Sequence, residues 1–132
     1  MIKKEKGYIA LTSVIIISAI ALLLAISASL FGVSETDMAV QQKHSSQAFY
    51  LANLCAEHAL MELKNELGYF GDETLGFEDG SCTVLPLEGN GNYDRIIKTT
   101  SSIYGQTRKI KIEINRVNPE IEISSWQEVV NF

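Results

Sequence analysis

Cysteine chemistry is the first chemistry that this sequence offers. Cys55 and Cys82 are the only two cysteines, about 27 residues apart, and in an oxidising compartment such a pair forms a lasting disulfide. Closing a loop of about 27 residues stabilises a small domain by about 3–4 kcal/mol in the chain-entropy model. Two unpaired buried thiols are the alternative. A metal site is not supported, because two cysteines without histidines at ligand spacing fall short of four ligands.

The histidines and serines do not form a catalytic arrangement. His44 and His58 are nearly four helical turns apart on one expected helix, so they cannot share a ligand. Ser45 and Ser46 follow His44, but adjacent residues of a helix point in different directions and no carboxylate is placed to orient the imidazole. We assign both histidines structural roles, and the sequence predicts no enzyme and no cofactor.

The acidic pairs and the glycine-rich loop are interpreted as turns. Asp72-Glu73 and Glu78-Asp79 lack the regular alternation of oxygen ligands in a calcium loop. The segment from Gly89 to Gly91 is too short, and its surroundings too acidic, to hold a phosphate. The sequence therefore predicts solvated turns, with no metal site and no small-molecule substrate.

Three aromatic side chains allow two interpretations. Tyr104, Trp126 and Phe132 could form an exposed adhesive patch. A small domain also needs aromatic anchors in its interior. Of the two interpretations, we favour a place for these side chains in the core of the domain.

The overall charge argues against one class of partner. The chain has 132 residues and a formal net charge of −5. Removing residues 1–7 takes away three lysines and one glutamate, and lowers the charge to −7. No basic patch is interleaved with aromatics, so direct nucleic-acid binding is not expected.

A long apolar run near the N-terminus determines on which side of a membrane the rest of the chain is expected. No charged side chain occurs from Tyr8 to Ser34, directly after the basic leader of residues 1–7. As a helix, about 27 residues span roughly 40 Å, more than the roughly 30 Å hydrocarbon core of a bilayer. Because the lysines lie only before the run, the positive-inside rule predicts a single-pass inner-membrane protein with a cytoplasmic N-terminus and both cysteines outside. Removal of the run as a signal peptide, at Ser27-Ala28-Ser29, is a lesser alternative.

The remaining pattern predicts an α+β fold. Apolar residues at spacings of three and four continue the helix over residues 35–67, with Gly68 and Gly71 as its stop. Alternating segments then predict an antiparallel sheet over residues 73–126. Its strands are expected at 73–77, 82–87, 93–104 and 106–117, with a short strand or tail through Trp126 and turns at Asp79-Gly80 and Gly105. We thus expect an outer domain, residues 35–132, in which the amphipathic half of one long helix packs on a small sheet.

The whole chain resembles the type IV pilins and pseudopilins. The most specific element is Lys6-Gly7-Tyr8 before the apolar run, and Gln47-Ala48-Phe49-Tyr50-Leu51-Ala52 looks like the helix of minor pilins of the PilX type. The resemblance implies that a prepilin peptidase cuts after Gly7 and methylates Tyr8. It also implies that the helix then packs against other pilin subunits in an extracellular filament.

One position departs from the main pilins. They carry a glutamate as the fifth residue of the mature chain, where this sequence has Thr12. A hydroxyl cannot neutralise the amino terminus of a neighbouring subunit, so the resemblance implies a minor or specialised subunit. A hydroxyl bonded back to its own helix would need no function. The alternative hypothesis is an unprocessed single-pass membrane protein with a small scaffold or sensor domain outside.

Overall fold

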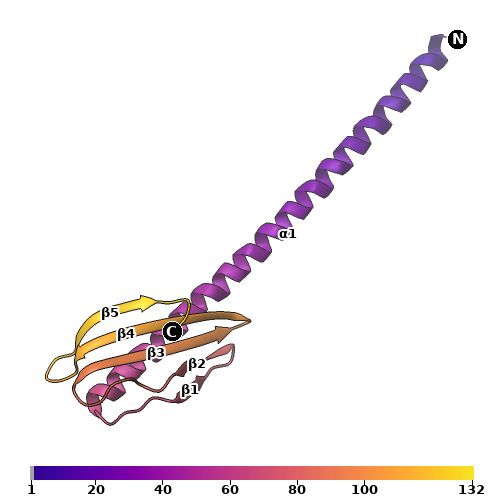
Figure 1. Cartoon of the computed structure of the whole chain (residues 1–132). Helices are drawn as coiled ribbons and strands as arrows, with labels where there is room; N and C mark the ends of the chain where they lie inside the picture. Colours follow the sequence, from indigo (N-terminus) through magenta and orange to yellow (C-terminus); the bar gives the residue numbers. More distant parts are fainter. Residues whose placement is uncertain (1) are drawn as a thin grey trace. The chain divides into compact units, whose positions relative to one another are not determined.

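One helix and five strands follow each other along residues 2–132 (Figure 1). The structure is a computed structural model that describes residues 2–132; Met1 of the predicted leader lies outside the described residues. The elements are α1 (Ile2–Asn65), β1 (Glu73–Gly76), β2 (Gly80–Val84), β3 (Tyr93–Ile103), β4 (Gln106–Arg116) and β5 (Glu122–Glu128). The predicted α+β layout, one long N-terminal helix and a small antiparallel sheet, is confirmed.

The chain divides into two units, and we describe each by itself. The N-terminal unit is Met1–Val40 and the C-terminal unit is Gln41–Phe132. The first contains the whole apolar run, and α1 is long and apolar enough there to cross a membrane. The second contains the rest of α1 and all five strands.

The sheet is a simple meander in the order β1-β2-β3-β4-β5, and every neighbouring pair is antiparallel. The turn between β3 and β4 consists of Tyr104 and Gly105, with φ of 45° and 80°. Two central residues with positive φ match the right-handed twist of the flanking strands, as in a type I′ hairpin. The turn predicted at Gly105 is therefore confirmed.

The last part of α1 covers one face of this sheet. Its buried side chains are mostly small, which lets the helix backbone lie close to the strands: Ala48, Ala52, Cys55, Ala56 and Ala59 are all 0% exposed, as is the larger Leu63. Opposite them lie buried Val and Ile side chains of β2, β3 and β4. Two β3 hydroxyls donate hydrogen bonds to helix carbonyls, Thr99 to Ala52 (3.0 Å) and Ser101 to Ala48. The predicted helical stripe is thus the core.

Several predicted boundaries shift by a few residues. Helix α1 ends at Asn65 instead of residue 67, and β2 ends at Val84 instead of residue 87. The carbonyls of Leu67 and Tyr69, which lie beyond the end of the helix, accept hydrogen bonds from Arg95 of β3. The β1–β2 turn lies near its predicted place, but Gly80 is already the first residue of β2. A Cβ at Gly80 would lie 2.3 Å from the carbonyl oxygen of Ser102. Glycine is required there by close contact with β3, and not by the turn.

Candidate functional site

The apolar run of α1 is the most extended surface of one chemical kind in this chain. All its large apolar side chains from Tyr8 to Val33 are 50–73% exposed. Soluble monomers rarely expose a contiguous apolar surface of such extent, and a surface of this kind marks contact with lipid or with other protein. The N-terminal unit therefore needs an apolar environment that it does not provide itself.

The polar side chains within this run are compatible with such an environment. Ser13, Ser18, Ser27 and Ser29 each donate a hydrogen bond of 2.7–2.9 Å to the carbonyl four residues earlier. A hydroxyl satisfied inside its own helix can enter hydrocarbon without leaving a donor unpaired. These serines therefore do not require a polar partner.

Thr12 makes the same kind of contact. Its hydroxyl lies 3.0 Å from the carbonyl oxygens of both Tyr8 and Ile9. The proton is thus given to the residue's own helix. This is the local hydrogen bond considered from the sequence, and a hydroxyl supplies no negative charge.

The predicted cleavage site, Gly7-Tyr8, lies within the helical residues of α1. A Cβ placed on Gly7 would meet no atom within 4 Å. Glycine inside a helix costs about 1 kcal/mol relative to alanine. Neither φ nor packing within the described residues requires glycine at this position.

The two cysteines come together in the C-terminal unit. Cys55 of α1 and Cys82 of β2 lie at disulfide-bonding distance, with their Cα atoms 6.2 Å apart. Cys55 is 0% and Cys82 is 1% exposed. The pair connects the helix to the second strand in the middle of the core, as the predicted disulfide would.

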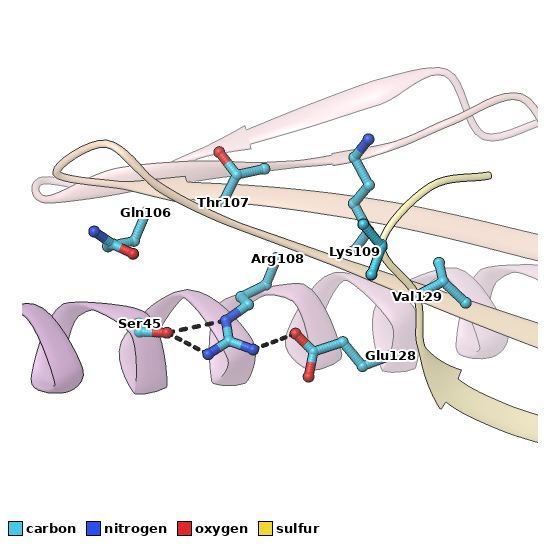
Figure 2. Close-up of a pocket in the computed structure, with 8 residues that line it drawn as sticks. Ser45, Gln106, Thr107, Arg108, Lys109, Glu128 and Val129 are labelled. Carbon is cyan, nitrogen blue, oxygen red and sulfur yellow. Dashed lines mark hydrogen bonds and ion pairs between the residues drawn. The ribbon is translucent and has the colours of Figure 1, made fainter.

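An open cleft lies between β4, the segment after β5, and α1 (Figure 2). Its volume is about 740 Å³. Arg108 crosses it, with Nε 3.0 Å from the hydroxyl of Ser45 and a second nitrogen paired with the carboxylate of Glu128. Lys109, Val129 and Val130 also line the cleft. Arg108 is therefore held by partners from α1 and β5, whereas Val130 is 88% exposed.

A second polar cluster joins the end of α1 to β1. One carboxylate oxygen of Glu73 accepts hydrogen bonds from Tyr69 and from Nε2 of His58, the latter at 2.8 Å. The hydrogen bond from Tyr69 lowers the pKa of Glu73, and His58 adds to that shift. Burial, and then the bond to Glu73, raise the pKa of Tyr69. Glu73 is thus a structural acceptor, and His58 has the structural role predicted for it.

Arg95 forms a cluster that the sequence analysis missed. Its side chain is only 4% exposed, and it donates to the carbonyls of Leu67, Glu88 and Gly91 at 3.1–3.2 Å. Burial lowers its pKa. The signal was present in the alternation of β3, which places Arg95 on the same face as the buried Ile97 and Thr99.

The three aromatics do not form a core, so that interpretation is wrong. Tyr104 and Trp126 are 63% and 38% exposed, and Phe132 is 45% exposed. They do not form one patch either. Tyr104 stacks on His44 and donates to Asp79 at 2.8 Å, Trp126 donates to Asn53 at 2.9 Å, and Phe132 lies under Lys98 and Lys109. Each of the three aromatic side chains therefore contacts a different part of the surface of the C-terminal unit.

The geometry thus offers an apolar helix surface in one unit, and a disulfide-bonded core with an open cleft in the other. No residue triad for catalysis emerges from these clusters, and no three metal-binding side chains gather among the described residues. Comparisons with known protein families, with curated proteins and with solved structures found no match.

Proposed function

We propose that this chain is a minor structural subunit of a type IV pilus or pseudopilus, cut after Gly7 and built into the filament through its N-terminal helix. The observation that carries the proposal is the junction at Gly7. A lysine-rich leader ends there in a glycine that the helix does not need for its conformation, and a long charge-free run follows. Recognition of this junction by a peptidase would explain both the glycine at position 7 and the change from a lysine-rich leader to a charge-free run.

The physical argument concerns what surrounds the apolar run. A helix that is apolar on all sides is stable in lipid, and equally stable when identical helices replace the lipid, because both bury the same surface. Lys3, Lys4 and Lys6 would cost several kcal/mol each if they entered a bundle of helices unpaired. Removing the leader would therefore release the helix from the membrane into a filament.

Thr12 supports the minor role. Its hydroxyl proton goes to its own helix, and it has no charge to pair with the amino terminus of the next subunit. A subunit without that ion pair suits a specialised position in a filament better than a position repeated throughout it. The subunit would first be stored in the inner membrane with its amino terminus inside, and then leave the cell in the filament.

Mass spectrometry of sheared filaments tests the proposal. We expect a chain that begins at methylated Tyr8. Gly7→Leu should abolish this species and hold the full-length chain in the membrane fraction. Gly32→Leu is the matched control, because a Cβ at Gly32 also meets nothing within 4 Å, and it should leave the cut unchanged.

An intact Met1 in the assembled fraction, or an unmethylated end far downstream, would contradict the proposal. A Gly7→Leu variant that matures normally would do so as well. A chain that stays uncut in the membrane fraction after shearing would instead support a single-pass membrane protein with an outer scaffold or sensor domain.

A further inference from the structure

A mostly apolar groove lies between α1 and the β1–β2 turn. Its volume is about 520 Å³, and its lining includes Tyr50 and Leu54 of α1, Ile103 of β3, and the turn from Phe77 to Gly80. Tyr50 and Phe77 are 71% and 49% exposed, and Leu54 is 46% exposed. Exposed aromatic rings are enriched where proteins bind other proteins. The groove is therefore a candidate contact surface.

Both walls of this groove are held in place by contacts within the chain. The amide of Phe77 donates to the carbonyl of Gly80 at 2.8 Å, which closes the turn around Glu78 and Asp79. Asp79 also accepts a hydrogen bond of 2.8 Å from the hydroxyl of Tyr104. On the other wall, Tyr50 and Leu54 are four residues apart in α1 and so lie on the same face of the helix. The groove is thus formed before a partner binds, which lowers the ordering cost of binding.

The charged side chains that line the groove are both acidic, Glu78 and Asp79. Neither has an ion-pair partner among residues 5–132. An acidic partner would be repelled, and a purely apolar partner would leave both carboxylates beside its apolar surface without a counter-charge. A lysine or arginine side chain avoids both costs, because its apolar stem packs on the rings and on Leu54 while its cation meets the carboxylates and the ring faces.

The strands of the C-terminal unit do not supply that cation. Each of their basic side chains already has a partner in its own chain. Carboxylates pair with Lys98, Arg108, Lys111 and Arg116, backbone carbonyls accept from the buried Arg95, and the ammonium of Lys109 lies 5.4 Å from the ring centre of Phe132. A strand of a second copy would have to break one of these contacts before it could bind the groove. The cation is therefore expected from a different protein.

We propose that the groove between α1 and the β1–β2 turn binds a segment of a different protein in which a lysine or arginine is flanked by apolar side chains. The cation lies beside Glu78 and against the rings of Tyr50 and Phe77, and the apolar neighbours pack on Leu54. This contact goes beyond the proposed function. It does not depend on the cut after Gly7, because every residue that lines the groove belongs to the C-terminal unit.

Photo-crosslinking in intact cells that produce the full chain tests this contact. With Phe77 replaced by p-benzoylphenylalanine, we expect an adduct with another protein, and mass spectrometry should map it to a peptide that has a lysine or arginine next to apolar side chains. The same replacement at Phe70, which is 61% exposed and outside the groove, should not give this peptide.

Several outcomes of this experiment would overturn the proposal. The absence of any adduct at position 77 is one of them. An adduct with lipid, with a second copy of this chain, or with an acidic or uncharged peptide would overturn it as well, because each replaces the basic and apolar segment by an occupant of different chemistry.

A charge substitution separates recognition of the cation from apolar contact alone. Glu78 is an exposed turn residue, so its replacement should not affect folding. In the chain that carries the photo-crosslinker at position 77, Glu78→Lys should lower the adduct yield about threefold or more, since it replaces an attractive exposed pair by a repulsive one. Glu120→Lys makes the same charge change at an exposed position outside the groove and should leave the yield unchanged. An unchanged yield with Glu78→Lys would overturn the proposal, because the partner would then be bound without its cation.

Discussion

The two halves of α1 have the same backbone conformation and opposite surface chemistry. From Tyr8 to Val33 the large apolar side chains are exposed, whereas from Ala48 to Leu63 a stripe of mostly small side chains is buried against the sheet. The second half is stabilised by its own chain. The first half has nothing in its unit to pack against, so its stability is set by its environment. A substitution should therefore act on folding in one half and on membrane insertion or assembly in the other.

The largest effect on folding should come from the disulfide. Replacing Cys55 and Cys82 together by alanine should lower the free energy of unfolding of the C-terminal unit by about 3–4 kcal/mol, because the loop that the bond closes becomes unrestricted in the unfolded chain. Guanidinium unfolding of the full chain in detergent measures this loss. Ser81→Ala, next to Cys82 on the outward side of β2, is the control and should have little effect. Titration of two accessible thiols in the oxidised wild type would refute the bond.

Substituting one exposed leucine in each half of α1 tests whether the two halves respond differently. Leu23 and Leu54 are both exposed, at 65% and 46%. Leu23→Lys places a charge in the middle of the apolar run and should cost about 2.5–3.5 kcal/mol of membrane insertion. Leu54→Lys changes a surface position of the C-terminal unit and should alter its unfolding free energy by no more than about 0.5 kcal/mol.

Membrane fractionation and detergent unfolding of both variants give the two readouts. We expect Leu23→Lys to leave the membrane and filament fractions while its C-terminal unit keeps wild-type unfolding. Leu54→Lys should keep the wild-type distribution between fractions. Equal insertion of the two variants would show that the apolar run does not depend on lipid or on neighbouring helices.

The sequence predicted the parts of this fold that have a simple period. The charge-free run and the helical stripe through Ala52 and Ala56 are regular patterns, and the alternation of Ile110, Ile112 and Ile114 is another. Together they predicted one long helix, its buried face and the sheet. The pairing of Cys55 with Cys82 was predicted on separate grounds, because both thiols were expected on the outer side of the membrane.

Contacts between distant segments were beyond such patterns. Ser45 and Arg108 are 63 residues apart, and Trp126 and Asn53 are 73 apart. Such pairs form because the meander brings β4 and β5 over α1, and no local signal marks them. The aromatics were misassigned for a related reason: with small residues on the helix, the centre of the core is filled mainly by isoleucine and valine, and the rings that pack against it are those of Phe49 and Tyr69.

The smallest expected effect is a pH dependence at the junction of α1 and β1. The hydrogen bond from Tyr69 holds the pKa of Glu73 below its usual 4.5, with a further contribution from His58. A depressed folded-state pKa means that the unfolded chain binds the proton more readily. The contribution is therefore present above about pH 4.5 and is lost as the pH falls through the folded-state value. Because the Glu73 side chain is 37% exposed, we expect a loss of less than about 1 kcal/mol.

Unfolding of the full chain in detergent between pH 3 and pH 7 would measure the contribution of ionised Glu73 to stability. That contribution is the difference in unfolding free energy between wild type and Glu73→Gln. The difference should shrink toward acid pH, because protonation removes from the wild type the same charge that the substitution removes. Tyr69→Phe deletes the main donor and keeps the carboxylate, so it should raise the pH at which stability is lost. Parallel profiles for wild type and Glu73→Gln would mean that the Tyr69–Glu73 bond does not favour the ionised form. The tie between α1 and β1 would then depend on packing alone.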